Sequence, residues 1–426
     1  MAEKQRVYFV IDMKSFFASV ECAERGLDAM TTKLVVADTS RTDTTICLAV
    51  SPAMKELGVK NRCRLYEIPK NLEYITAKPR MRKYIDYAAE IYGIYLKYID
   101  PNDIHVYSID ESFIDVTDYL KMYKLKAKDF AKKLTGEILE KLGIPATVGI
   151  GTNLYLAKIA LDITAKKSPE RIGWLTEDKF IKELWNHQPL TDFWGISTGI
   201  SNRLAKHNIY DMKGITQCNE DILYKEFGIN AELIIDHAWG KETCLMSDIK
   251  NYKTKSKSIS NSQILPCGYK YEDARLVFCE MIQEGCYRLM RDGLATDLVN
   301  IQIGYQDDKE HRTKGSTRLH NRTNVYSQMI DEILKLFDEL VDKKMKVRQL
   351  GFTFGNLLDE SLEQYDFFTD YSEIQKEKKL AHSILDIKDK FGKNAILKGL
   401  DYMPNATQRE RNQQIGGHND GTSEDA

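Results

Sequence analysis

The stretch that most constrains the fold covers residues 107–115, where two adjacent carboxylates interrupt a strand-like sequence. Ile109 and Phe113 are β-branched and aromatic residues of the kind that favours a strand. Neighbouring side chains on a regular strand point to opposite faces, so Asp110 and Glu111 can share one site only where the strand bends. Burying two like charges together is costly unless a cation neutralises them. A solvated pair of acids at a hairpin turn is the competing interpretation.

A second apolar stretch, residues 7–13, also carries a carboxylate near its end. Asp12 cannot lie unpaired in a core, so it must face solvent, a metal or a base at the end of the strand. If the two strands are neighbours in one sheet, Asp12, Asp110 and Glu111 converge. Three carboxylates without a nearby His or Cys suit Mg²⁺, and ions bound in this way usually act on substrate phosphates.

Together these two stretches resemble the two catalytic motifs of the Y-family (UmuC/DinB-type) DNA polymerases. The first motif covers residues 11–13 and 15–21, and the second covers residues 108–111. Residues 407–418, near the end of the chain, are similar to UmuC-like members from Gram-positive bacteria and their mobile elements. The resemblance covers essentially the whole chain. It implies an error-prone polymerase that copies past damaged bases, in DNA repair, mutagenesis and the SOS response.

The resemblance also implies a right-hand polymerase fold, a multidomain α/β (α+β) architecture. Its parts are a ferredoxin-like palm (1–32 and 78–172), small fingers (33–77), a helical thumb (173–247), a linker (248–258), an α/β little finger (259–356) and a C-terminal tail (357–426). A chain of 426 residues is too long for one ordinary domain. We expect strands at 7–11, 34–37, 45–50, 146–151, 298–305 and 347–354. We expect helices at 15–25, 52–57, from 79 onward, at 126–142, 154–163, 330–337 and 380–391, and disorder over 416–426.

Composition sets further limits on the kind of protein. Hydrophobic residues make up 42% of the chain and charged residues 29%, as in soluble globular proteins. The apolar run near the N-terminus is too short for a signal peptide or a membrane span. The eight Cys contain no C-x-x-C pair, so neither a zinc site nor a disulfide framework is expected. We therefore expect a cytoplasmic, nucleoid-associated protein with no membrane partner.

Matching to the family's motifs implies the catalytic roles. Asp12 and Asp110 would bridge two Mg²⁺ ions, with Mn²⁺ as an alternative, while Glu111 holds the first ion and the main-chain carbonyl of Met13 holds the second. The implied reaction transfers a nucleotide from a dNTP to the primer 3′-hydroxyl of primer–template DNA, by positioning and charge stabilisation. The alternative is a catalytically inactive UmuC-like regulator that binds DNA or the sliding clamp. The three intact acids favour the enzyme.

Four residues are implied to bind the nucleotide. Phe17 falls at the family's steric gate, where a ring under the sugar would clash with a ribose 2′-hydroxyl, and Phe16 lies beside it. Without the resemblance, Phe17 is a core residue of a helix. Lys55, which stands where the family often has Arg, and Lys166 would hold the triphosphate. The spacing from Asp162 to Lys166 is one residue longer in this sequence than is usual in the family.

DNA contacts are expected in the thumb, where residues 193–206 resemble a helix-hairpin-helix. In that motif a hairpin presents main-chain N–H groups to a DNA phosphate. Gly195, Ser197 and Gly199 form the hairpin here, with Ser197 in the place of the usual second glycine. A plain tight turn between thumb helices is the alternative.

The net charge of −2 does not indicate a nucleic-acid binder, so a basic surface must be local. One candidate is the basic linker, with Lys255 and Lys257. The other is a run of cations in the little finger that would bind the DNA backbone, and a solvated hairpin is its alternative interpretation. The members of this run are Arg312, Lys314, Arg318 and Arg322.

The tail contains a short peptide similar to the one by which bacterial polymerases hold the sliding clamp (β). A Gln followed by aromatic rings in a polar stretch suits an anchor that docks in a pocket. Its residues are Gln364, Tyr365, Phe367 and Phe368. An accessory protein of the UmuD-like or recombinase kind is a further candidate partner.

Overall fold

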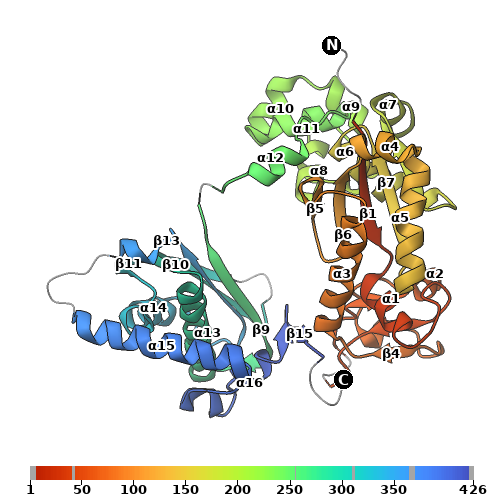
Figure 1. Ribbon diagram of the computed structural model, residues 1–426. Coiled ribbons are helices and arrows are strands. Elements are labelled where there is room, and N and C mark those ends of the chain that lie inside the picture. The colour runs from red at the N-terminus through yellow and green to blue at the C-terminus, as the bar shows by residue number, and fades with distance from the viewer. Residues whose placement is uncertain (1–5, 41–43, 255, 309–311, 364–369, 422–426) are drawn as a thin grey trace. The chain divides into compact units, whose positions relative to one another are not determined.

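The computed structural model describes residues 6–40, 44–254, 256–308, 312–363 and 370–421. The chain forms two units (Figure 1). Unit 1 comprises Met1–Tyr252 and His418–Ala426, and unit 2 comprises Lys253–Gly417. The first crossing between them falls inside the predicted linker.

Strand β1 (Tyr8–Met13) forms the centre of the five-stranded sheet of unit 1 (Figure 1). The sheet order is β5 (Ile104–Val106), β6 (Glu111–Asp115), β1, β7 (Ala146–Gly151) and β8 (Ile172–Leu175). Strand β1 runs antiparallel to both of its neighbours. Its apolar side chains are buried in two cores, one on each face of the sheet. Only its penultimate residue, Asp12, escapes full burial.

Helices cover both faces of this sheet. One face packs against α1 (Phe16–Ala23), α3 (Met81–Leu96), α4 (Thr117–Tyr123) and α5 (Ala127–Leu142), and the other against α6 (Leu154–Ile159) and α12 (Met246–Asn251). Helix α6 lies so close to β7 that a Cβ on Gly149 would come within 2.0 Å of the Ala157 carbonyl oxygen. A Cβ on Gly151 would come within 2.2 Å of the Ala157 nitrogen. Main chain therefore packs on main chain here.

Two smaller parts complete unit 1. A three-stranded sheet, β3 (Ala49–Val50), β2 (Leu34–Val36) and β4 (Ile75–Ala77), packs with α2 (Pro52–Glu56) around its own core. Five helices share another core with α6: α7 (Glu177–Leu184), α8 (Thr198–Ala205), α9 (Met212–Gln217), α10 (Glu220–Phe227) and α11 (Asn230–Ala238). Only the end of the strand predicted at 45–50 forms, and α12 occupies the first part of the predicted linker.

Unit 2 is built on an antiparallel sheet in the order β11 (Arg312–Thr323), β10 (Leu294–Tyr305), β12 (Val347–Gly355) and β9 (Ile259–Tyr269). Helices α13 (Tyr271–Arg291) and α14 (Tyr326–Leu340) form a core with it. Helix α15 (Tyr371–Phe391) runs beside α13 (Figure 1). A short strand, β13 (Leu358–Asp359), pairs with β10.

The end of the chain differs from the prediction. Helix α15 begins at Tyr371 rather than at residue 380, because the side chain of Asp370 caps it by accepting the N–H groups of Ser372 and Glu373. Beyond it lie α16 (Gln408–Arg411), β14 (Gln414–Ile415) and β15 (His418–Asn419). The predicted disorder over 416–426 is therefore wrong for residues 416–421. In the described ranges, no helix combines the length and the apolarity that crossing a bilayer requires.

Candidate active site

Strand pairing brings the three predicted acids together. Asp12 on β1 and Glu111 on β6 are Cα partners across the sheet. Asp110 lies in the turn between β5 and β6, and its carbonyl oxygen accepts the Met13 N–H at 2.9 Å. The chain bends at residues 108–110. Such a bend is what allows Asp110 and Glu111 to share one site. The acids thus occupy a hairpin, and that hairpin lies against the end of β1.

The hairpin is held in place by contacts that the sequence did not reveal. The Ser108 hydroxyl donates to Asp110 Oδ1 at 2.7 Å, and the Tyr107 N–H donates to the Glu111 carbonyl at 3.0 Å. The Tyr107 ring packs edge-on against Trp194, whose Nε1–H donates to the Tyr107 hydroxyl at 3.3 Å. Trp194 directly precedes the glycine-bearing hairpin of the helical part, so the acid-bearing turn is anchored to a second element of unit 1.

The acids repel one another in a partly desolvated place. Burial, reinforced by the charges of Asp110 and Glu111, raises the pKa of Asp12 to about 7. Burial also raises the pKa of Glu111, whose Oε1 is buried without a hydrogen-bond partner in the described part of the chain. Buried carboxylate oxygens without enough protein cations are the ligands that a hard divalent cation prefers. The residues present therefore fit the Mg²⁺ predicted for this site.

Lys158 on α6 is a residue of this site that the sequence analysis missed. Its Nζ lies 2.9 Å from Glu111 Oε2 and 3.2 Å from Asp162 Oδ2. The signal for it was present, because Lys158 is a charged residue in the otherwise apolar stretch 154–161. With Glu111 turned to Lys158, no group of three His, Cys, Asp or Glu side chains in the described residues is already arranged to hold a metal ion.

Three lysines lie near Asp12. The Lys55 Nζ donates to the Ser15 hydroxyl at 2.8 Å. Desolvation and then the charges of Lys14 and Lys166 lower the pKa of Lys55, while the charge of Asp12 opposes this shift. Lys14 and Lys166 are therefore both close enough to repel Lys55, and such a cation cluster suits a polyphosphate. Lys14 was not predicted, although it directly follows Met13.

A π-helical turn explains how Lys166 reaches this cluster. The extra residue noted between Asp162 and Lys166 falls where the helix becomes a π-helix over Ala160–Thr164, followed by a 3₁₀ turn over Ala165–Lys167. A π-turn is wider than an α-turn by one residue, so it absorbs one additional residue without rotating the next turn of the chain.

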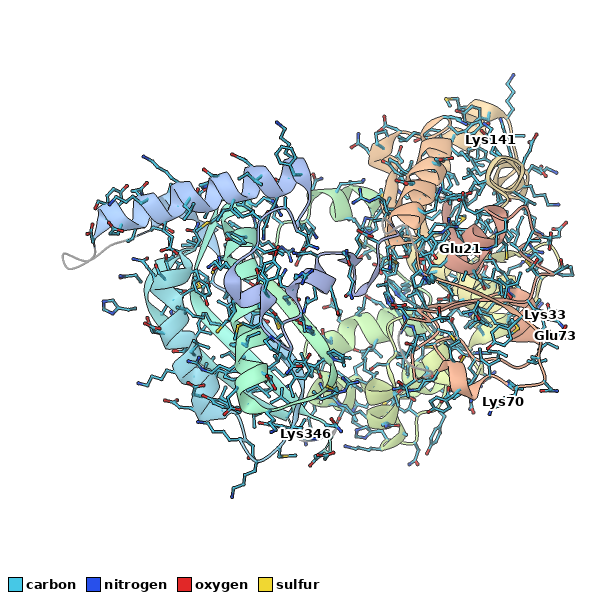
Figure 2. All side chains as sticks on the ribbon, turned by 90° about the horizontal axis from the view of Figure 1, so that it is seen from below. Glu21, Lys33, Lys70, Glu73, Lys141 and Lys346 are labelled. Atoms are coloured by element: carbon cyan, nitrogen blue, oxygen red, sulfur yellow. The ribbon has the colours of Figure 1, made fainter. Side chains whose placement is uncertain are left out.

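Phe17 lies on α1 with its ring stacked on Tyr84, at a centroid distance of 4.6 Å. The Tyr84 hydroxyl donates to Glu21 Oε1 at 2.8 Å, and Arg80 donates two bonds of 3.0 and 2.8 Å to the same carboxylate. The side chain of Glu21, which Figure 2 labels, is completely buried. The side chain of Phe16 lies in the core at 3% exposure, so only its main chain remains for a nucleotide contact.

The predicted helix-hairpin-helix is present in reduced form, because its first helix is only a 3₁₀ turn over Leu190–Asp192. Gly195 adopts a φ of +90°, which a residue with a side chain rarely adopts. The Ser197 hydroxyl caps α8 by accepting the Ile200 N–H. Gly199, in the first turn of α8, is exposed. Gly195, Ser197 and Gly199 are thus exposed residues around the N-terminus of α8.

The basic strand β11 of unit 2 exposes alternate residues, among them Arg312, Lys314 and Arg318. Arg322 is a correction to the predicted set: its guanidinium pairs with Asp297 at 2.7 Å and is only 17% exposed. That bond serves the packing of unit 2. Lys257 is exposed. Outside the described residues lie Lys255, Gln364, Tyr365, Phe367 and Phe368.

Known proteins are similar to this chain in sequence and in fold. The family described as the impB/mucB/samB family matches residues 11–162, and its C-terminal domain matches residues 256–367. A putative UV-damage repair protein UvrX of Bacillus subtilis is 30% identical, with 96% of each chain covered. DNA polymerase IV 2 of the same bacterium is 31% identical, covering 97% of this chain and 99% of the relative. A solved Y-family DNA polymerase chimera of Dbh and Dpo4 superposes with a TM-score of 0.65 at 22% identity, covering 83% of this chain and 99% of the other.

The pKa of Asp12 predicts a pH-dependent stability for the metal-free protein. Asp12 keeps its proton in the folded state up to about pH 7, whereas in the unfolded chain it loses it near its ordinary value of 3.8. The free energy of unfolding should therefore fall as the pH rises between these two values, by at most about 1.4 kcal/mol per pH unit. Asp12→Asn should remove this decrease, as measured by urea unfolding with a chelator at pH 5 and pH 8. An equal pH dependence in both proteins would contradict the prediction.

Proposed function

The chain belongs to the impB/mucB/samB family, the UmuC-like branch of the Y-family DNA polymerases, and on this premise we propose that it is an error-prone translesion polymerase that works by a two-metal mechanism. The enzyme is a DNA-directed DNA polymerase, whose substrates are primer–template DNA and dNTPs. The observation that carries the mechanism is the meeting of Asp12, Asp110 and Glu111 beside a cluster of lysines.

The acids would hold the divalent ions. Asp12, Asp110, Glu111 and the main-chain carbonyl of Met13 would hold two Mg²⁺ ions, and Mn²⁺ would find similar ligands there. When bound, such ions supply activation of the primer 3′-hydroxyl and charge neutralisation on the leaving pyrophosphate. In the absence of ions, burial raises the pKa of Glu111, and the Lys158 ammonium, 2.9 Å away, opposes this rise. Lys158 thus favours the ionised form of this carboxylate, which is the form that binds a metal ion.

The lysines would bind the triphosphate of the nucleotide, and the stacked rings of Phe17 and Tyr84 would lie at its sugar. Lys55, Lys166 and Lys14 offer positive charge to the triphosphate next to the acids. The Phe17 ring, supported from behind by Tyr84, would lie under the sugar and exclude a 2′-hydroxyl. The chain's own residues therefore act by orienting the nucleotide, which brings the α-phosphate to the primer end.

The competing function, a catalytically inactive regulator, does not require this arrangement. A protein that only binds DNA gains nothing from three mutually repelling acids, since their repulsion raises the free energy of the metal-free fold. The acids therefore favour the enzyme.

Asp110→Ala should slow primer extension by at least about a thousandfold, because it removes a proposed metal ligand. The variant should still fold, because the substitution relieves charge repulsion on Asp12. Primer extension with Mg²⁺ and thermal unfolding measure the two effects. Glu140→Ala, which removes an exposed carboxylate from α5, is the matched control and should extend normally. Extension at the wild-type rate by folded Asp110→Ala would refute the site assignment.

Phe17→Ala should raise ribonucleotide incorporation relative to deoxyribonucleotide incorporation, because the ring that would meet the 2′-hydroxyl is gone. Single-nucleotide insertion with matched ribo- and deoxynucleoside triphosphates measures the ratio. Tyr66→Ala, which removes a 59% exposed ring from the smaller sheet region, is the control and should leave the ratio unchanged. An unchanged ratio in Phe17→Ala would return Phe17 to a purely packing role.

DNA binding should be salt-sensitive despite the negative net charge. Replacing Arg312, Lys314 and Arg318 by Gln should weaken binding to all sequences alike, and should flatten the salt dependence by up to about one unit per lost phosphate contact. The control removes three exposed charges from elsewhere on unit 2: Lys344, Lys379 and Lys393. If both triple variants change the slope equally, β11 is not the DNA-binding surface.

We also propose that Gln364, Tyr365, Phe367 and Phe368 tether the enzyme to the sliding clamp, since backbone contacts alone are weak at physiological salt. Phe367→Ala with Phe368→Ala should abolish clamp binding and clamp-stimulated synthesis, and leave unassisted insertion intact. Phe391→Ala removes a 67% exposed ring from α15 and serves as the control. Clamp binding that survives the double substitution would place the anchor elsewhere.

A further inference from the structure

The chain returns to unit 1 at its C-terminal end. Residues from His418 onward belong to unit 1, whereas the residues before them belong to unit 2. Asp420 is only 9% exposed, although acidic residues are normally solvated. No step of nucleotide transfer accounts for this segment.

The segment supplies a cap that helix α3 lacks. The first N–H groups of a helix have no acceptors within the helix. Arg80, at the N-cap position of α3, makes no side-chain capping bond, and the first turn contains no acidic residue. The main-chain carbonyl of Asp420 accepts the N–H of Arg82 at 3.0 Å. The helix dipole also favours an acidic residue at this end.

Gly421 brings the segment directly onto the main chain of Arg80. A Cβ on Gly421 would lie 2.9 Å from the Arg80 Cβ and 3.0 Å from its Cα, and its φ is +85°. Only glycine satisfies both the space and the conformation. The Gly421 N–H donates to Asn419 Oδ1 at 2.7 Å, which closes the turn that presents it.

Arg80 is also the residue that holds the support of Phe17. Its guanidinium donates to Glu21 at 3.0 and 2.8 Å, and Glu21 accepts the Tyr84 hydroxyl at 2.8 Å. Arg80 and Tyr84 are joined again by the first main-chain bond of α3, from the Tyr84 N–H to the Arg80 carbonyl at 3.2 Å. A shift of this first turn would therefore reach the ring stacked on Tyr84.

We propose that Asp420 and Gly421 are positioning residues of the nucleotide site. By docking on the first turn of α3 they hold Arg80, and through Glu21 and Tyr84 they fix the ring of Phe17. If residues 420 and 421 left the first turn of α3, the Phe17 ring could move and make room for a 2′-hydroxyl. The inference rests on the proposed role of Phe17 as the barrier to ribonucleotides.

The test compares two glycine variants of the full-length protein. Gly421→Ala meets both an unfavourable φ and the clash with Arg80, whereas Gly417→Ala has a similar φ of +82° and no atom within 4 Å of its new Cβ. Hydrogen exchange of peptides containing Arg82 measures whether residues 420 and 421 remain bound to α3. The ratio of ribonucleotide to deoxyribonucleotide incorporation measures the effect on Phe17. Gly421→Ala should exchange several-fold faster and raise the ratio several-fold, and Gly417→Ala should match the wild type.

Two deletions guard against a variant that fails to fold. Removal of residues 418–426 should reproduce the effect of Gly421→Ala, and removal of 422–426 should have none. A ratio that rises in Phe17→Ala but stays at the wild-type value in Gly421→Ala and in the longer deletion would overturn the inference alone. A ratio that stays unchanged even in Phe17→Ala would overturn both the proposed gate and this inference. Equal Arg82 exchange in the two glycine variants would also overturn the inference.

Discussion

Repulsion among three carboxylates is the constraint on which unit 1 depends. Two of them, Asp12 and Glu111, face each other because β1 and β6 pair in the centre of a sheet that is buried on both sides. The third, Asp110, is fixed by the main-chain bond from Met13 and by the packing of the turn against Trp194. The main-chain positions that carry the acids cannot separate without breaking the sheet. Part of the folding free energy is thus held as an electrostatic mismatch that a bound cation would relieve.

Several lysines lie near the three carboxylates, but they do not neutralise all of them. Lys158 pairs with Glu111 and Asp162 and is largely buried, so it belongs to the acidic side. Lys55, whose charge Asp12 stabilises, is repelled by Lys14 and Lys166. A nucleoside triphosphate with its divalent ions carries the matching alternation of charge. The site is therefore complementary to the loaded substrate more than to either of its components alone.

The sequence alone was sufficient for the features that depend on local pattern. Apolar strands that end in acids predicted β1, the bend at Asp110 and the meeting of the three carboxylates, and the pattern of apolar residues predicted helices such as α3, α5, α6 and α14. Features that depend on contacts between distant residues were not predictable. Nothing near Arg322 in the sequence shows that Asp297 binds it, and nothing near Arg80 shows that residues 420 and 421 lie on its main chain. The start of α15 was missed for a different reason, because its cap at Asp370 lies only two residues after the predicted clamp peptide.

The contact of α6 with β7 bears on how this protein can diverge. Gly149 and Gly151 place the main chain of the strand against the main chain at Ala157, next to Lys158. The distance between the lysine-bearing helix and the acid-bearing sheet is therefore set by backbone atoms and not by the volume of core side chains. Substitutions that exchange one apolar residue for another of similar size usually cost little stability, and here they leave that distance unchanged. The core of unit 1 is thus free to drift in sequence, while mutation at these two glycines is the change that would displace Lys158 from Glu111.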